Sequence, residues 1–114
     1  MHKIIDKIRQ HQGAIGKYPL PKEAQIPYVR DLSLALVVEL SEMLRELPWK
    51  PWAQAKGPSF EQRVLALEEL TDVFIFAFAL AVALGMEPLL EASILTKIEI
   101  NMTRLKSGVH TKHI

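Results

Sequence analysis

Four acidic residues form two pairs with helical spacing in the middle of the chain. Glu39 and Glu42 are three residues apart, and so are Glu69 and Asp72. Residues at this spacing lie on the same face of a helix, so each pair would present two carboxylates together. Both faces continue into apolar residues. The acids are therefore placed beside side chains that favour burial.

Basic residues that could neutralise these acids are scarce on the same segments. The residues four positions after Glu39, Glu69 and Asp72 are methionine, valine and phenylalanine. Arg45, three residues after Glu42, is the one local cation. Sheltering an unpaired carboxylate costs several kcal/mol, so a cation from elsewhere is expected. Acids on a solvated surface are the alternative.

A divalent metal ion is the cation that these ligands favour. If the two helices pack side by side, up to four carboxylates meet, and such an oxygen-only set suits Mg²⁺, with Mn²⁺ as a substitute. Zinc is disfavoured because the chain has no cysteine and its histidines lie near the chain ends, at His2, His11, His110 and His113. Di-iron sites are disfavoured because neither acidic segment contains histidine.

Two further segments carry side chains that suit a nucleotide. Lys97, Asn101 and Arg104 share one helix face, where they could bind the oxygens of a polyphosphate. Basic residues in a last turn also complement the helix dipole, which is the alternative. Trp49 could stack on a nucleobase while Lys50 meets a phosphate. The tryptophan could equally anchor a loop.

Helices separated by proline and glycine must position these residues. A first helix is expected before Gly13, and three prolines predict a non-helical arm over residues 17–27. Further helices are expected at 28–47, from the capping box of Ser59 and Gln62 to Gly85, and at 88–106. No segment alternates as a strand would. The predicted fold is therefore all-α.

Length and composition fit one globular domain over residues 1–114. The chain is 49% hydrophobic and 24% charged, and we divide it into an N-terminal helix and arm (1–27), a helical core (28–108) and a loose tail (109–114). A net charge of +1 offers no field for nucleic acid or an anionic membrane. No cysteine and no signal peptide are found, so we expect a cytoplasmic protein without a membrane partner.

The apolar stretch over 73–84 indicates how the protein assembles. It is apolar around its whole circumference, whereas a helix of a four-helix subunit buries roughly one stripe. A second subunit would cover the remainder. We therefore expect a four-helix bundle-like subunit completed by dimerisation, as a homodimer or a dimer of dimers whose active sites share residues.

The chain resembles the all-α nucleoside triphosphate pyrophosphatases, a superfamily that includes the MazG proteins and the dimeric dUTPases. The resemblance covers residues 30–108 and rests on three ordered segments, RDLSLALVVELSEMLRELPWKPW, LEELTDVFIFAFALAVALGM and KIEINMTRLKSG. The tryptophan–lysine stretch of the first segment is more similar to the dUTPase branch. The resemblance implies Mg²⁺-dependent hydrolysis of a deoxynucleoside triphosphate to the monophosphate and pyrophosphate.

The resemblance also implies residue roles. It makes Glu39, Glu42, Glu69 and Asp72 the metal ligands, and it makes Lys50, Lys97, Asn101 and Arg104 contacts to phosphate or sugar. Glu39 or Glu42 is the expected base for the attacking water. A glutamine near the nucleobase is assigned to Gln12, with Gln10 as the second candidate. The base itself, uracil or another as in MazG-like nucleotide housecleaning, stays open.

A rival prediction comes from another class of protein. A non-catalytic helical interaction module would use the apolar third helix to dock a partner and would leave its acids solvated. It predicts neither Mg²⁺-dependent stabilisation nor nucleotide hydrolysis.

Overall fold

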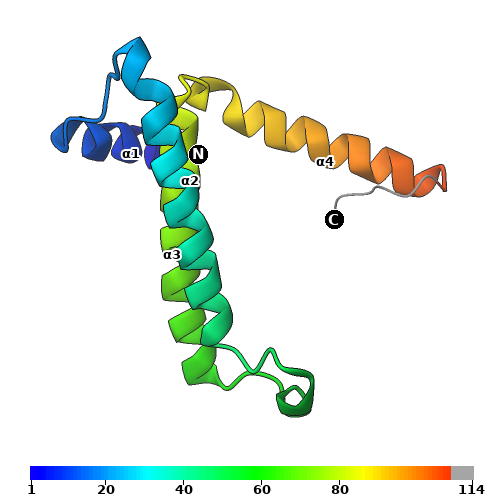
Figure 1. Ribbon diagram of the computed structural model, residues 1–114. Coiled ribbons are helices and arrows are strands. Elements are labelled where there is room, and N and C mark those ends of the chain that lie inside the picture. The colour runs from blue at the N-terminus through cyan, green and yellow to red at the C-terminus, as the bar shows by residue number, and fades with distance from the viewer. Residues whose placement is uncertain (109–114) are drawn as a thin grey trace.

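The computed structural model describes residues 1–108, which form helices only (Figure 1). The elements are α1 (His2–Ala14), α2 (Lys22–Arg45), α3 (Phe60–Ala83) and α4 (Leu90–Lys106), with the short 3₁₀ helices η1 (Pro51–Ala53) and η2 (Glu87–Leu89). No strand occurs among the described residues, so the all-α prediction is confirmed. The predicted tail 109–114, with His110 and His113, lies outside the described residues.

Helix α3 begins and ends at the predicted signals. The Ser59 hydroxyl accepts a hydrogen bond from the Gln62 backbone N–H at 3.1 Å, and the Gln62 side chain accepts one from the Ser59 N–H at 2.8 Å. These bonds satisfy two of the N–H groups that a helix start leaves unpaired. Gly85 follows the helix with φ +69°, a left-handed conformation that favours glycine.

Helix α2 begins earlier than the sequence predicts. It starts at Lys22 and contains Pro27, so the prediction of a non-helical arm over 17–27 is wrong for its last six residues. Pro27 lacks the N–H that would bond the carbonyl of Glu23, in the first turn of the helix. Both residues are exposed, so water can bond this carbonyl and the helix tolerates the proline.

The antiparallel helices α2 and α3 lie side by side and form the body of the molecule (Figure 1). Helix α1 packs against α3 at the end of the pair where α3 ends. The core lies there and consists of Ile8, Leu32, Ala79, Val82 and Ala83. Among the described residues no large side chain is completely buried. One chain therefore supplies only a small core.

Helix α4 projects from the body as a separate arm (Figure 1). The chain turns through 116° between α3 and the segment η2–α4, and none of the 17 residues of α4 is buried. Its apolar side chains are open to solvent, with Leu105 65% exposed. The radius of gyration is 17.3 Å, against about 13 Å for a compact domain of this length. The subunit thus has four helices but an extended shape, which is consistent with an oligomer.

The apolar part of α3 also keeps open surface, including Phe74 and Ile75. No single helix in the described part of the chain is long and apolar enough to span a membrane. Helix α3 and the segment η2–α4 are long and apolar enough only when they are counted together, and the chain bends through 116° between them.

Candidate functional site

The predicted acidic residues meet where α2 and α3 lie side by side. One carboxylate oxygen from each of Glu39, Glu69 and Asp72 lies within 4.8 Å of the others. Glu42 lies one turn from Glu39 on the same helix, and its charge helps to raise the pKa of Glu69. We call these four residues the acidic cluster. Helix spacing places two acids on each face, and the packing of α2 on α3 brings the two faces together.

The acidic cluster is electrostatically strained. A hydrogen bond with Glu39 raises the pKa of Glu69 to about 7, with further contributions from desolvation and from the charges of Glu39 and Glu42. Two carboxylates this close repel each other when both are ionised, so a proton or a cation stabilises the pair. Oε2 of Glu39 is buried, and no hydroxyl, amide or cationic donor of the described residues reaches it. The cluster thus binds a positive charge or holds a proton.

The cluster lacks a strong cation of its own. The one ion pair that reaches it among the described residues joins Arg45 Nη2 to Glu42 Oε1 at 3.7 Å, and Arg45 is largely exposed. Exposed pairs of this length are weak. Neither α2 nor α3 contains histidine or cysteine. Several carboxylate oxygens with one buried, unpartnered oxygen fit a hard divalent cation such as Mg²⁺.

The loop between α2 and α3 holds the aromatic residues. Lys50 Nζ lies 5.8 Å from the ring centre of Trp49 and 5.4 Å from that of Trp52. A cavity of about 530 Å³ opens beside them, and its lining includes Trp49, Lys50 and Arg45. This volume lies within the range of small-ligand pockets. Because Arg45 also pairs with Glu42, the cavity adjoins the acidic cluster.

The predicted phosphate contacts on α4 are not brought to the acidic cluster within one chain. Lys97, Asn101 and Arg104 lie on the projecting arm, which leaves the body at the end opposite the aromatic loop (Figure 1). Asp72 is eleven residues from the end of α3 at Ala83, which is about 17 Å along the helix. Within a single chain, the basic residues of α4 are therefore separated from the acidic cluster.

Gln12 is also separated from the aromatic loop. It is 3% exposed, and its side-chain oxygen accepts a hydrogen bond from the Tyr28 hydroxyl. It lies on α1, at one end of α3, whereas Trp49 lies in the loop at the other. Helix α3 has 24 residues and is about 36 Å long. The two side chains therefore cannot contact the same base within one chain.

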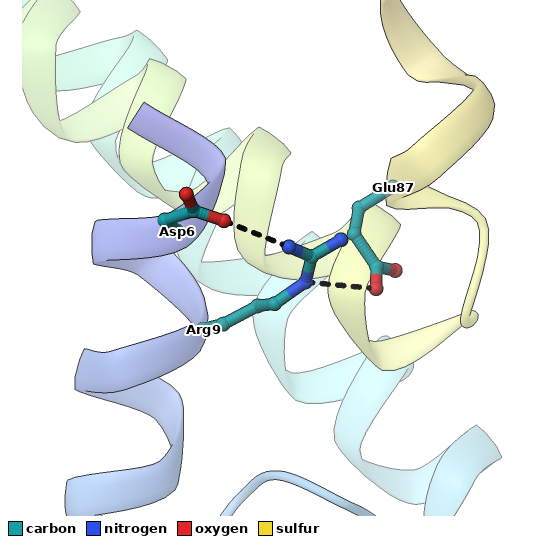
Figure 2. A network of polar contacts seen from close by, with 3 residues as sticks. All are labelled: Asp6, Arg9 and Glu87. Carbon is teal, nitrogen blue, oxygen red and sulfur yellow. Dashed lines mark hydrogen bonds and ion pairs between the residues drawn. The ribbon is translucent and has the colours of Figure 1, made fainter. Parts of the chain in front are cut away.

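Three charged residues that sequence analysis did not select form a network at the turn before α4. Arg9 contacts Glu87 and Asp6 (Figure 2). Glu87 is buried, although it is followed by a proline and looks in the sequence like an ordinary helix start. No local pattern marks it, because its partner is 78 residues away.

Comparison with known protein families decides the class of this protein. A family model described as dUTPase matches residues 3–107. The chain belongs to this dUTPase family. The match places it in the all-α branch, within the MazG-like nucleoside triphosphate pyrophosphatases, so the resemblance is confirmed. Searches among curated proteins and solved structures found no significant match.

The dUTPase family assignment settles the reaction class. This dUTPase-family chain is a nucleoside triphosphate pyrophosphatase, and the non-catalytic interaction module is not supported. Its substrate is a nucleotide, and enzymes of the dUTPase family typically depend on a metal ion. The acidic cluster is the group of described residues that could hold one.

Proposed function

We propose that the protein is a Mg²⁺-dependent pyrophosphohydrolase that converts a deoxynucleoside triphosphate and water into the monophosphate and pyrophosphate. The observation that carries this proposal is the acidic cluster, in which carboxylates from two helices meet within 4.8 Å and Glu39 has a buried, unpartnered Oε2. Glu39, Glu42, Glu69 and Asp72 would hold Mg²⁺, which neutralises phosphate charge when bound.

The carboxylates of α2 are the proposed bases for the attacking water. Attack at the α-phosphorus breaks its bond to the bridging oxygen, so pyrophosphate leaves and the water oxygen stays on the monophosphate. Glu39 or Glu42 accepts the proton that the water loses. Glu42 contacts solvent and Arg45, whereas Glu39 has a buried free oxygen. A Glu42→Gln variant that retains Mg²⁺ binding and loses turnover would identify Glu42 as the base.

The aromatic loop is the proposed position of the nucleobase. Trp49 and Lys50 line an open cavity next to Arg45, which borders the acidic cluster. A base stacked on Trp49 would therefore have its phosphates directed toward the acids. The dUTPase family favours dUTP as the substrate, with dCTP and other nucleotides as alternatives that small changes of the pocket would permit.

The proposed assembly is a homodimer, or a dimer of dimers, in which α4 of one chain completes the site of the other. Arg104 and Glu69 each lie fourteen residues from the turn between α3 and α4, which is about 21 Å. Because the chain turns through 116° there, the two helices are about 20 Å apart at that distance. This separation leaves room for one further helix at the usual spacing of 8–10 Å from each of the two. One helix of a partner's α2–α3 pair would therefore fit beneath the arm.

The experiment that tests the catalytic proposal is a substrate panel. The protein is incubated with each common deoxynucleoside and ribonucleoside triphosphate, with and without Mg²⁺, and pyrophosphate is measured. We expect turnover of dUTP in Mg²⁺ and none in EDTA. Absence of turnover with every nucleotide would contradict the proposal.

The shared site is tested with mixed dimers. Chains carrying Glu39→Gln and Arg104→Ala are co-expressed with different tags, and the heterodimer is purified. If α4 acts on the partner, one of the two sites contains only native residues, so about half of the native activity is expected. If α4 acts within its own chain, both sites carry a substitution and the heterodimer has no more activity than the variants.

A further inference from the structure

The turn between α3 and α4 is held by an ion pair between a partly exposed arginine and a buried glutamate. We call residues 84–89 the elbow. Glu87, in the elbow, is 5% exposed, and its Oε1 accepts a hydrogen bond from Arg9 Nε at 3.2 Å (Figure 2). A buried carboxylate is costly without a partner. The position of the elbow is therefore tied to the position of Arg9.

Arg9 belongs to a helix that is itself fixed to the body. On the inner side of α1, Ile5 and Ile8 are buried, and Gln12 accepts the hydrogen bond from Tyr28 of α2. The guanidinium of Arg9 also donates from Nη1 to Asp6 at 2.9 Å, and Asp6 is mostly exposed. Helix α1 thus connects α2 to the elbow through these side-chain contacts.

Helix α4 has no other polar attachment to the body within the described residues. Gln25 donates to the carbonyl of Ala83 at 2.9 Å, but this bond holds the end of α3, before the chain turns. No described hydrogen bond or ion pair of a side chain joins α4 to α1, α2 or α3. Among the described residues, the Arg9–Glu87 pair is therefore the polar side-chain contact that joins the elbow to the body.

A small change at the elbow would be large at the far end of the arm. Arg104 lies fourteen residues along α4, about 21 Å from the elbow, so a rotation of about 10° moves it by about 4 Å. A hydrogen bond does not survive such a displacement. The direction of α4 must therefore be set accurately if its basic residues are to bind a ligand.

We propose that Arg9 and Glu87 are positioning residues for nucleotide binding. Their ion pair sets the direction of α4 and so holds Lys97, Asn101 and Arg104 where they bind the triphosphate. The inference rests on the proposed function, because it assigns the phosphate contacts to α4. It adds residues of α1 and the elbow, which touch neither the metal ligands nor the nucleotide.

Kinetic measurements on Glu87→Gln test the role of the pair, with Asp6→Asn as the matched control. Asp6 contacts the same guanidinium from the exposed side, so its variant should leave the kinetics unchanged. For Glu87→Gln we expect the KM for dUTP to rise about tenfold and kcat to change less than about threefold, because misplaced phosphate contacts weaken substrate binding. The exchanged pair Arg9→Glu with Glu87→Arg should recover part of the lost affinity.

A general loss of structure would give a different pattern. In that case kcat and the Mg²⁺ affinity of the acidic cluster would fall together with substrate affinity. That result, or a KM equal to the native value, would overturn the proposal.

Distance measurements test the elbow independently of activity. The chain has no cysteine, so spin labels can be attached at Arg63→Cys on α3 and Lys106→Cys on α4, both exposed. Labelled chains are diluted with unlabelled chains so that distances within one chain are recorded. Glu87→Gln should broaden the distance distribution, and Asp6→Asn should leave it sharp.

The two proposals fail in different ways. A native protein without turnover contradicts the proposed function, while the distances still decide whether the ion pair sets the arm. An unchanged distribution in Glu87→Gln overturns the positioning role even in an active enzyme.

Discussion

The α2–α3 pair and helix α4 carry opposite halves of the proposed chemistry and differ in how they are supported. In the pair, acids from two helices meet within 4.8 Å and are partly sheltered by the packing that brings them together. In α4, the basic residues lie on a helix with no buried residue. A single chain thus assembles its acidic cluster, but it leaves the basic residues at a distance from it.

Each half of the site is therefore positioned by a different kind of support. The acids are positioned by direct packing over the length of two helices, which is the rigid kind of support that a metal site needs. The basic residues depend on one turn, one partly buried ion pair and, we propose, a second subunit. The following predictions test this contrast.

The largest effect is expected for Glu39→Gln. The substitution keeps the shape of the side chain but removes a charge at the centre of the cluster. If the acids hold Mg²⁺, losing one ligand should lower kcat/KM by about 10³-fold, the equivalent of several kcal/mol of transition-state stabilisation. Steady-state kinetics with dUTP would measure the loss.

A neighbouring acid provides the control for this variant. Glu68 is exposed and lies outside the acidic cluster, so Glu68→Gln should keep kcat/KM within about twofold. Activity of Glu39→Gln within a few-fold of the native value would mean that the cluster is not the catalytic centre.

A smaller loss is expected for Arg104→Met. Removing one charge-assisted hydrogen bond to phosphate costs about 2 kcal/mol, or about 30-fold in kcat/KM. Mg²⁺ binding to the nucleotide-free protein should stay native, since the proposed role of Arg104, on α4, is to contact phosphate and not the metal ion. Calorimetric titration with Mg²⁺ separates the two effects. An equal loss of Mg²⁺ affinity would show that the two regions are not separate.

A weaker effect is expected for subunit association when the apolar face of α4 is charged. Ile98 is 47% exposed in one chain, and a second subunit would cover it. Ile98→Lys should raise the dimer dissociation constant by about tenfold, because an apolar interface then buries a charge. Sedimentation velocity over a concentration series measures this, with the polar exchange Thr103→Lys as control. Unchanged association would exclude α4 from the interface.

The smallest effect concerns pH and the protein without Mg²⁺. The pKa of Glu69 is about 7 in the folded protein, above its ordinary value of 4.5. Between these values the folded chain keeps a proton that the unfolded chain has lost, so the free energy of unfolding falls as pH rises. Below this pH window the contribution of Glu69 to the free energy of unfolding is constant. Above the window the whole contribution has been lost.

Urea titrations in EDTA from pH 5 to pH 8 would measure this dependence. Glu39→Gln should flatten it, because an amide donates a hydrogen bond to the ionised Glu69. If the stability of the native protein and that of the variant show the same pH dependence, the coupling between Glu39 and Glu69 is contradicted.

Much of the fold follows from local patterns in the sequence. The capping box at Ser59 and the glycine at position 85 limit α3 as predicted, since both signals act within a few residues. The start of α2 was missed because three prolines in a short span normally exclude a helix. Only Pro27 lies inside α2, near its exposed start, where the carbonyl that lacks a hydrogen bond is open to solvent.

The acidic cluster was also predictable. Spacing assigns each pair of acids to one helix face. The lack of neighbouring basic residues indicates that both pairs bind the same positive ion. The Arg9–Glu87 pair was not predictable, because its residues are far apart in the sequence and neither belongs to a motif.

Local sequence was thus sufficient to define the helices apart from the start of α2, the acids that share each face and the family to which the chain belongs. Tertiary structure alone decided that α2 and α3 bring the acids together, that Gln12 lies far from Trp49, and that α4 leaves the body. Periodicity records which residues share a face of one helix. It does not record which face meets another, because that depends on turns and contacts between residues distant in the chain.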